Sequence, residues 1–277
     1  NGLFNLGLLK SVEFKLPVIA VGNLSAGGTG KTPHVEYLIR LLKDHYKLAV
    51  ISRGYLRKTR GFVLADINST VLMVGDESIL LTDFHSLYSN DFLLPAGRLR
   101  EPKTGAKRAD IIIVTKTDPV FSPLSKRAVL EQIKPLPHQK VFFSYVTYGL
   151  PIPLFAELPP LRYNMINTIV LFAGIANPYP LEQYLKRLCN ELVTIYFNDH
   201  HPFTEKDIKD IKETYNNQFS KRKVLITTEK DAMRLRDPLI ASLFKGIPIY
   251  YIPIEISFHF REKEKFDKLI LDFVETV

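Results

Sequence analysis

The sequence predicts an α/β fold: a doubly wound, mostly parallel sheet followed by a second, smaller α/β domain. Three observations lead to this prediction. Continuous apolar runs such as residues 111–114 are typical of parallel strands covered on both faces. These runs alternate along the chain with amphipathic helical patterns. A glycine-rich turn joins the first apolar run to the first helical pattern, as at the ligand-binding edge of such sheets.

The elements of the first domain follow in order. LPVIAVGN, residues 16–23, predicts a strand ending at Gly22, and residues 32–46 predict a helix with one apolar face. KLAVISRGY, residues 47–55, predicts a second short strand with a basic loop behind it. RADIIIVTKTD, residues 108–118, predicts a fully buried strand that opens into a loop.

A proline-rich stretch, GLPIPLFAELPPL at residues 149–161, interrupts this alternation. We therefore expect a P-loop domain over residues 1–152 and a smaller C-terminal α/β domain over residues 153–277. In the second domain, strands and helices alternate again. IPIYYIPIEI, residues 247–256, reads as one strand, and a final helix starts at about Glu262.

Composition limits the classes of partner. The 277 residues carry a net charge of +8 with a pI near 9.3, which suits a nucleotide, a nucleic acid or an anionic membrane surface. The single cysteine, Cys189, excludes an internal disulfide framework. No apolar run approaches the roughly 20 residues that a membrane-spanning helix needs.

The stretch AVGNLSAGGTGKT, residues 20–32, differs from the P-loop pattern G-x-x-x-x-G-K-[ST] in one residue, Ser25 in the first position. Its glycines let backbone N–H groups turn toward a phosphate chain, and the following helix points its positive end there. The lysine can reach the outer phosphates, and the last threonine can bind Mg²⁺. A turn that binds nothing is the alternative. The predicted nucleotide-binding residues are Ser25, Ala26, Gly27, Gly28, Thr29, Gly30, Lys31 and Thr32.

A second loop offers a rival function. VTKTD, Val114 to Asp118, is similar to the base-reading loop of guanine-specific GTPases, and it follows a buried strand. Because Thr115 stands where those proteins carry Asn, we favour a simple strand-end loop. A P-loop GTPase switch or a metallochaperone stays the alternative function, although a single cysteine argues against metal delivery.

Several motifs occur in order over nearly the whole chain: KLPVIAVGNLSAGGTGKTPHVEYL, ISRGY, VGDE, LLPAGRLREP, RADIIIVTK, FAGIANP, FNDHHPFTEKD and ITTEKDAMRL. Together they resemble the tetraacyldisaccharide 4'-kinase family of lipid A biosynthesis. The resemblance implies transfer of the ATP γ-phosphoryl group, with Mg²⁺, to the 4'-hydroxyl of a lipid disaccharide 1-phosphate, giving lipid IVA and ADP. It also implies a place at the cytoplasmic face of the bacterial inner membrane, held by an N-terminal helix that this chain does not include. A nucleic-acid ATPase would rest only on the basic charge, since the sequence offers no platform of aromatic and basic residues, and we expect no nucleic-acid partner.

One departure from the family pattern concerns Mg²⁺. The family carries an acidic motif, Asp-Asp-x-x-Gln-His, between its GDE segment and its LLTD strand. Here VGDES runs directly into ILLTDF, so that Ser78 is joined to Ile79. Either the segment is missing from the numbered chain or the protein lacks it, and we favour the first interpretation.

The resemblance also assigns catalytic residues. Asp76 in VGDE is the expected base, His200 in DHH its partner, and Lys31 the phosphate-binding cation. Asp199 and His201 could support His200. Without the resemblance, Asp76 reads as a helix N-cap, and the DHH segment as a polar loop before a helix capped by Thr204.

The motif GRLREP predicts the acceptor site. The guanidinium groups of Arg98 and Arg100 suit a phosphate, and Glu101 would orient an arginine or bind the acceptor; a surface salt bridge is the alternative. Weaker candidates are Ser52 and Arg53 as phosphate contacts and Asp83 for Mg²⁺. For Lys230 and Asp231 we expect a nucleotide-binding or interdomain role, with a helix-start cap as the alternative.

Overall fold

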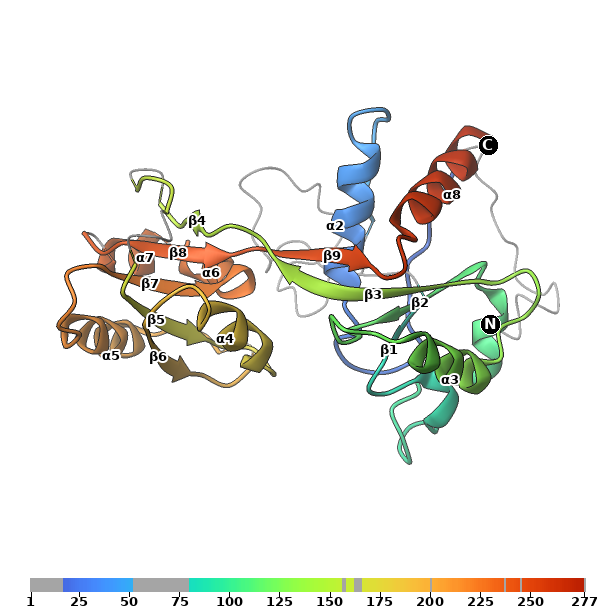
Figure 1. The fold of residues 1–277 in the computed structure, drawn as a ribbon, viewed down its shortest axis with the longest axis horizontal. Coiled ribbons are helices and arrows are strands. Elements are labelled where there is room, and N and C mark those ends of the chain that lie inside the picture. The colour runs from blue at the N-terminus through green and yellow to red at the C-terminus, as the bar shows by residue number, and fades with distance from the viewer. Residues whose placement is uncertain are drawn as a thin grey trace. The chain divides into compact units, whose positions relative to one another are not determined.

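The chain forms two compact units (Figure 1). The computed structural model describes residues 17–51, 80–155, 158–161, 166–199, 201–236, 238–244 and 246–276. Of these, residues 17–51, 80–146 and 256–276 form the first unit, and those between 147 and 255 form the second. The division differs from the expected single boundary after residue 152, because the last strand and the last helix belong to the first unit.

The sheet of the first unit has the order β1-β2-β3-β9. Its strands are β1 (Leu81–Asp83), β2 (Ile111–Thr115), β3 (Lys140–Tyr148) and β9 (Ile254–Phe258). β1 and β3 both pair in parallel with β2. The predicted buried strand is confirmed, since residues 112–114 of β2 are at most 1% exposed. The mostly parallel α/β class predicted from the apolar runs is therefore confirmed.

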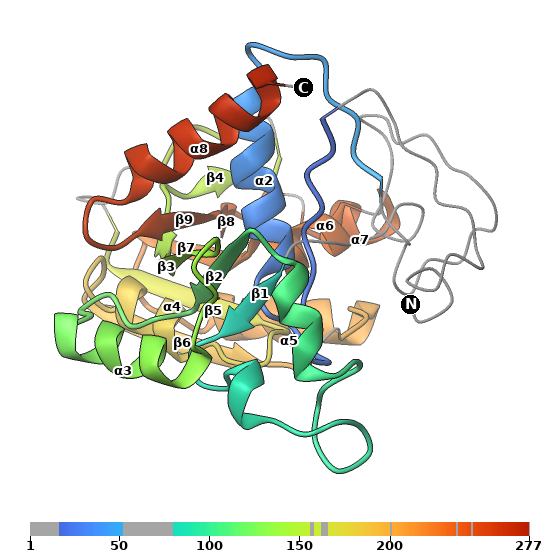
Figure 2. The ribbon, with the colours of Figure 1, turned by 90° about the vertical axis from the view of Figure 1, so that its right-hand side faces the viewer.

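Helices cover both faces of this sheet. Figure 2 shows α2 (Lys31–Leu42) and α8 (Lys263–Thr276) on one side of it and α3 (Pro123–Ile133) on the other. Neighbouring side chains of a strand point to opposite faces, and the core follows this rule. Phe142 packs in a cluster with Phe266 of α8, while Phe143 packs in a second cluster with Val129 of α3. Two short 3₁₀ helices, η1 (Tyr88–Asn90) and η2 (Lys103–Arg108), complete the unit.

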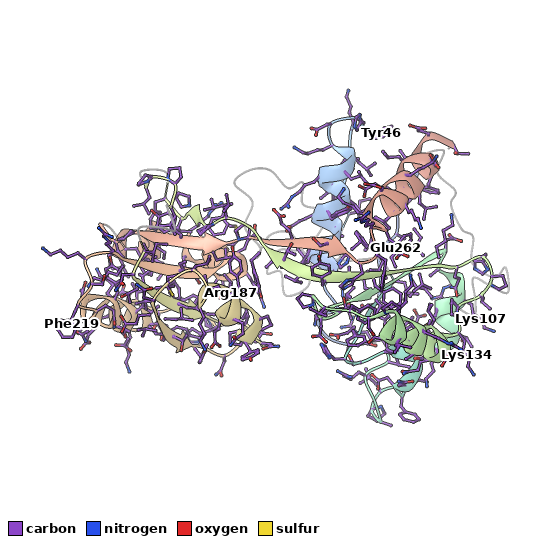
Figure 3. The ribbon with its side chains drawn as sticks, viewed as in Figure 1. Tyr46, Lys107, Lys134, Arg187, Phe219 and Glu262 are labelled. Carbon is purple, nitrogen blue, oxygen red and sulfur yellow. The ribbon has the colours of Figure 1, made fainter. Side chains whose placement is uncertain are left out.

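The C-terminal segment joins the first unit because the predicted strand 247–256 is broken at Pro253. Proline has no N–H to donate to a sheet ladder, and on either side of it the chain enters two different sheets as β8 (Ile249–Ile252) and β9. Beyond β9, the Lys126 ammonium lies 2.8 Å from the carboxylate of Glu262, which Figure 3 labels at the start of α8.

Two predicted strands of the first domain are not found among their described residues. Residues 17–20 have no strand structure, while the buried Val21 forms a single β-bridge and the Leu81 N–H donates to the Gly22 carbonyl. Residues 47–51 also lack strand structure, and Ile51 is 82% exposed. Residues 52–55 of the second predicted strand lie outside the described residues.

The second unit is a smaller α/β sheet with the order β4-β8-β7-β5-β6. Its remaining strands are β4 (Ile152–Pro153), β5 (Thr168–Ala173), β6 (Glu191–Tyr196) and β7 (Lys223–Thr228). β5, β6, β7 and β8 run parallel, while β4 pairs antiparallel with β8. The helices are α4 (Tyr179–Leu185), α5 (Glu205–Asn216), α6 (Glu229–Leu235) and α7 (Pro238–Leu243).

β5 explains why the unit is doubly wound. Every residue of this strand is buried, so both of its faces must be covered. Val170 and Phe172 pack in a cluster with residues of α5 and α6, whereas Ile169 and Leu171 pack in a second cluster with residues of α4. Within the described ranges, no helix combines the length and the apolarity that crossing a bilayer requires.

Candidate functional site

The glycine-rich loop before α2 has the backbone conformation that its glycines permit. Gly27 and Gly30 have φ angles of +111° and +85°, which L side chains rarely adopt, and Gly30 caps the N-terminus of α2. Ser25, the residue that departs from the motif, is not among the described residues with positive φ. The substitution therefore introduces no backbone strain at that position.

The space beside the middle of the glycine-rich loop is open. A Cβ atom added at Gly27 or Gly28 would meet nothing within 4 Å, while one at Gly30 would lie 3.7 Å from the Nδ1 of His34. The first backbone N–H groups of α2 have no partner within their helix, and the helix dipole is positive at this end. This geometry can accept an anion beside Gly27 and Gly28.

In the part of the chain that the structure describes, polar side chains in and beside the loop include one hydrogen-bonded pair and one buried hydroxyl without a partner. The Lys31 ammonium donates to the amide oxygen of Asn23 at 3.1 Å, and the Asn23 amide donates to the Ser25 carbonyl. Thr29 is buried, and its Oγ1 atom has no hydrogen-bond partner among the described residues. A buried hydroxyl without a partner is costly. The loop therefore holds a polar group that a bound ligand or water would satisfy.

The side chain of His34 links the glycine-rich loop to β3 through hydrogen bonds. Its Nδ1 lies 2.7 Å from the Gly30 carbonyl, and its Nε2 lies 2.9 Å from the hydroxyl of Ser144 in β3. Burial lowers the pKa of His34 to about 4, although the hydrogen bond to Gly30 raises it. The ring is therefore neutral near pH 7. Because a carbonyl only accepts, Nδ1 carries the proton and Nε2 accepts from Ser144.

The GRLREP loop, residues 97–102, lies directly against the glycine-rich loop, residues 25–32, which is termed the phosphate loop below for its P-loop motif. The Ala26 N–H donates to the Arg98 carbonyl at 2.6 Å, and the Arg100 N–H donates to the Leu24 carbonyl at 2.8 Å. Ser25 and Leu99 thus form an antiparallel bridge between two segments far apart in the chain. The structure brings the predicted acceptor arginines and the predicted nucleotide loop together.

The charged groups of GRLREP have protein partners. The Arg98 guanidinium lies 3.3 Å from the Asp91 carboxylate. The pKa of Asp91 lies below its ordinary value, first because the Arg98 N–H donates to the carboxylate and then because the Phe92 N–H does. The Nη2 group of Arg108 donates to both carboxylate oxygens of Glu101, at 2.9 and 3.1 Å. This pair matches the salt-bridge alternative for Glu101.

The VTKTD loop is also engaged with protein groups. The Lys116 ammonium lies 2.8 Å from the Asp83 carboxylate. The Thr117 hydroxyl lies 2.9 Å from the Ser144 carbonyl and 2.8 Å from Nε2 of His259, and Thr117 is buried. These contacts account for the loop without a guanine base, and they pair Asp83 with a cation.

In the second unit, His201 has a structural environment. Its Nε2 lies 2.9 Å from the Asp207 carboxylate, and its ring stacks on Phe197 with centroids 4.7 Å apart. Asp207 also belongs to the capping box of Thr204 at the start of α5, which confirms the predicted cap. Burial raises the pKa of Asp207, but the hydrogen bonds from Thr204 and His201 outweigh this and lower it.

Asp231 is fully buried at the start of α6. Its carboxylate accepts from the Gly174 N–H and the Thr228 hydroxyl, both at 2.8 Å, and pairs with Arg234 at 2.9 Å. These contacts match the helix-cap interpretation of Asp231. The neighbouring Lys230 ammonium lies 2.7 Å from the Asp199 carboxylate.

Four predicted site residues lie outside the described residues: Ser52, Arg53, Asp76 and His200. The junction between Ser78 and Ile79 lies outside them as well. Among the residues that the structure does describe, no group of three or more histidine, cysteine, aspartate or glutamate side chains is arranged to hold a metal ion.

Three residues that contact each other or the glycine-rich loop were not among the predicted ones: Asn23, His34 and Ser144. Asn23 carried a usable signal, because it follows an apolar run and precedes the glycine-rich turn. His34 lies on the apolar face of a predicted helix, where a histidine has no obvious role. Ser144 is 110 residues away from His34, and no local pattern connects the two.

A parallel sheet, a glycine-rich loop that starts a helix, and a basic segment bound to that loop define a P-loop nucleotide-binding protein. The chain belongs to the tetraacyldisaccharide 4'-kinase family. The family model described as tetraacyldisaccharide-1-P 4'-kinase matches residues 1–88 and 78–275.

Relatives and a solved structure agree with this assignment. A tetraacyldisaccharide 4'-kinase of Parabacteroides distasonis is 38% identical over 333 residues, covering 100% of this chain and 90% of the relative. One from Flavobacterium johnsoniae is 38% identical over 325 residues, covering 99% and 92%. The crystal structure of LpxK from Aquifex aeolicus in complex with ATP is 22% identical, with a TM-score of 0.67, covering 99% of this chain and 93% of that one. This last likeness shows a shared fold.

The alignments also bear on the departure at Ser78. They extend over 325 to 339 residues for the 38% identical relatives, more than the 277 residues of this chain. The two matched parts of the family model meet at residues 78–88, beside the junction of Ser78 and Ile79. The relatives therefore carry residues that this numbered chain lacks, and the family match is interrupted at the expected position.

Proposed function

We propose that this chain transfers the γ-phosphoryl group of ATP to the 4'-hydroxyl of a tetraacyldisaccharide 1-phosphate, giving lipid IVA and ADP. Family membership supports the reaction. The observation that carries the proposal is the backbone bridge between Ser25 and Leu99, because it joins the phosphate loop to the arginine-bearing loop. A phosphoryl donor and an anionic acceptor can then be bound by adjacent segments.

The nucleotide site consists of the loop from Ser25 to Thr32. The open space beside Gly27 and Gly28, the unpartnered Thr29 hydroxyl and the start of α2 fit a phosphate chain. Lys31, now bound to a neutral amide oxygen, would bind the outer phosphates, and the Thr32 hydroxyl would hold Mg²⁺. ATP supplies the phosphoryl group, and Mg²⁺ neutralises charge on it.

The proton of the acceptor hydroxyl needs a base, and we assign Asp76 to that role with His200 as its partner. A carboxylate paired with an imidazole can take a proton and hold it during transfer. The contacts of His201 with Asp207 and Phe197 support assigning the partner role to the other histidine of the pair.

We assign the contacts with the lipid acceptor to residues of the GRLREP loop. Arg98 and Arg100 are next to the phosphate loop through their backbones, and guanidinium groups bind phosphate oxygens in a two-pronged geometry. We assign Glu101 the role of orienting a cation, since its carboxylate binds Arg108. The net charge of +8 suits an anionic lipid at the cytoplasmic surface of the inner membrane, with no nucleic-acid partner.

The test follows label from γ-labelled ATP in the presence of Mg²⁺ and a lipid A disaccharide 1-phosphate. We expect label on the lipid, less label with GTP, and a loss of at least about a hundredfold for Asp76→Asn, as for removal of a general base. Asp210→Asn, which changes an exposed carboxylate of α5, is the matched control. Label released only as free phosphate, with GTP preferred, would overturn the proposal in favour of a GTPase.

A further inference from the structure

A loop next to the phosphate site holds apolar side chains in solvent. In this loop, residues 91–99 and termed the apolar loop below, Phe92 is 67% exposed, Leu93 46% and Leu94 56%. Single exposed apolar residues are normal on protein surfaces. Three consecutive ones on one loop are notable, because exposed apolar surface that gathers in one place marks binding surfaces.

Hydrogen bonds and a glycine define the backbone conformation of the apolar loop. Backbone hydrogen bonds join Leu94 N–H to Leu99 O, Leu99 N–H to Phe92 O, and Gly97 N–H to Leu93 O, at 2.9 to 3.0 Å. A Cβ at Gly97 would lie 2.3 Å from the Phe92 carbonyl oxygen, so the loop folds back on itself where only glycine fits. The exposure of its side chains therefore follows from a defined backbone.

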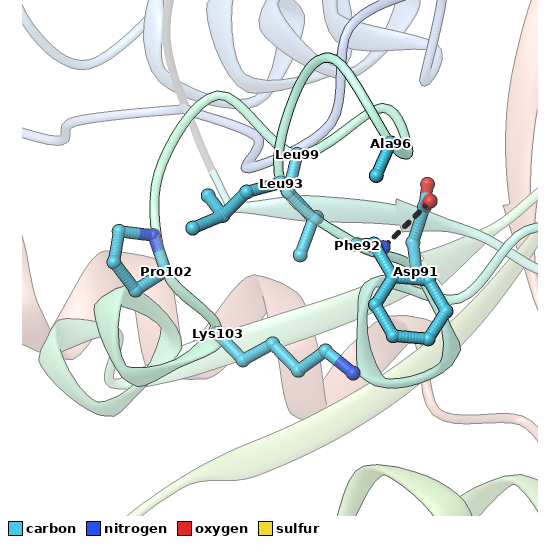
Figure 4. A pocket seen from close by; sticks show the side chains of 7 residues that line it. All are labelled: Asp91, Phe92, Leu93, Ala96, Leu99, Pro102 and Lys103. Atoms are coloured by element: carbon cyan, nitrogen blue, oxygen red, sulfur yellow. Dashed lines mark hydrogen bonds between the residues drawn. The ribbon is translucent and has the colours of Figure 1, made fainter.

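Beside these side chains lies a pocket of about 410 Å³ with an almost wholly apolar lining. Ligand pockets of several hundred Å³ are of the usual size. In Figure 4, Pro102 stands at one side of it and Phe92 at the other, with the Lys103 chain extended between them. The Lys103 ammonium donates to the Ser89 carbonyl and lies 5.4 Å from the centre of the Phe92 ring. The lining residues are Asp91, Phe92, Leu93, Ala96, Leu99, Pro102 and Lys103.

The pocket and the proposed acceptor groups share one short segment. Leu99 lines the pocket and is 1% exposed, while its neighbours Arg98 and Arg100 hydrogen-bond through their backbones to the phosphate loop. Cationic groups and a hydrocarbon-lined pocket thus lie within a few residues of each other. That pairing matches an amphiphile with an anionic head and an apolar chain.

We propose that this pocket binds one acyl chain of the lipid acceptor. The inference rests on the proposed function, because it names how the same site recognises the apolar part of its substrate. The charge and the lining favour an amphiphilic phosphate over a neutral ligand, and the pocket volume suits a single chain segment rather than several. The apolar loop therefore selects acylated over deacylated acceptors.

The first experiment needs no catalysis. Binding of dodecyl phosphate, below its micelle concentration, is compared with binding of butyl phosphate by calorimetry. We expect dodecyl phosphate to bind more tightly, with each added methylene worth up to about fourfold in affinity. Leu93→Ser should weaken dodecyl phosphate binding by at least about tenfold and leave butyl phosphate binding unchanged. Leu124→Ser, at another exposed apolar residue of the first unit, is the matched control.

Two results would overturn the inference: equal affinity for the two probes, or an equal loss of both in Leu93→Ser. Circular dichroism of the variant checks its fold, and Phe92→Ser provides a second variant at a more exposed position. Since neither probe is phosphorylated in this assay, failure of the kinase proposal alone would not change these outcomes.

A bilayer is the competing occupant. Binding to acceptor-free vesicles of equimolar phosphatidylcholine and phosphatidylglycerol is measured by sedimentation. We expect Leu93→Ser to bind these vesicles like the parent chain. We also expect the variant to have a higher KM for the acylated acceptor, with kcat unchanged, when activity is measured in detergent solution without a bilayer. Weakened vesicle binding together with normal activity in detergent would assign the apolar loop to the membrane surface and overturn the acyl-chain inference.

Discussion

Replacement of His34 tests whether the phosphate loop rests on a buried, neutral imidazole. His34→Asn keeps an amide donor near the position of Nδ1, which faces the Gly30 carbonyl. His34→Gln instead places its amide near the position of Nε2, which faces Ser144. Each variant therefore keeps one of the two hydrogen bonds. We expect His34→Gln to lose more ATP affinity than His34→Asn, because it releases the loop carbonyl.

The shifted pKa of His34 sets how strongly the free energy of unfolding depends on pH. The pKa of His34 is lowered from its ordinary value of 6.5 to about 4 by burial. As the pH falls below 6.5, the unfolded chain takes up a proton that the folded chain refuses, so stability falls. At 1.36 kcal/mol per pH unit, the loss is about 3 kcal/mol between pH 6.5 and pH 4. Above pH 6.5 the parent chain keeps this stability in full.

The variants lack this titration. Above pH 6.5 we expect His34→Asn to be less stable than the parent by about 1 to 3 kcal/mol, because a buried group of Ser144 loses its partner. Toward pH 4 the difference should shrink by about 3 kcal/mol and reach zero or change sign.

Hydrogen exchange read on peptides of α2 and β3, corrected for the intrinsic rate at each pH, measures the opening free energy of this unit. His138→Asn, at an exposed histidine of the same unit, is the control and should follow the parent at every pH. Parallel pH profiles for the parent chain and His34→Asn would refute the reasoning, since they would mean that His34 binds its proton equally in the folded and unfolded states.

Three further outcomes are expected. Gly27→Ala should weaken ATP binding about tenfold by calorimetry, since a left-handed backbone costs an L residue about 1 to 2 kcal/mol; Gly246→Ala, at φ +81° in the second unit, should leave ATP affinity unchanged. Thr204→Ala should lower the urea stability of the second unit by about 1 kcal/mol through the lost helix cap, and an unchanged midpoint would contradict this. Asp231→Ala should cost the same unit about 3 kcal/mol or more in thermal melts, because it leaves the buried Gly174 N–H without its acceptor.

Features set by neighbouring residues were predictable from the sequence, whereas features that depend on distant segments were not. The buried run of β2, the capping box at Thr204 and the glycine-rich loop before α2 were all predictable, because periodicity, cap chemistry and backbone freedom act within a few residues. The strand prediction was wrong for residues 17–20, because apolar composition signals burial without fixing where the backbone pairs; within the described residues 17–22, pairing is found only at Val21 and Gly22.

By itself, the sequence determined the α/β class, the position of the phosphate loop and, through its ordered motifs, the family. Only the tertiary structure decided that Ser25 pairs with Leu99, that His34 contacts Ser144, and that the last helix returns to the first unit. These contacts join residues more than 70 positions apart, and no local pattern encodes them. The physical reason is that they form only where packing of the two sheet faces brings distant segments within hydrogen-bonding distance.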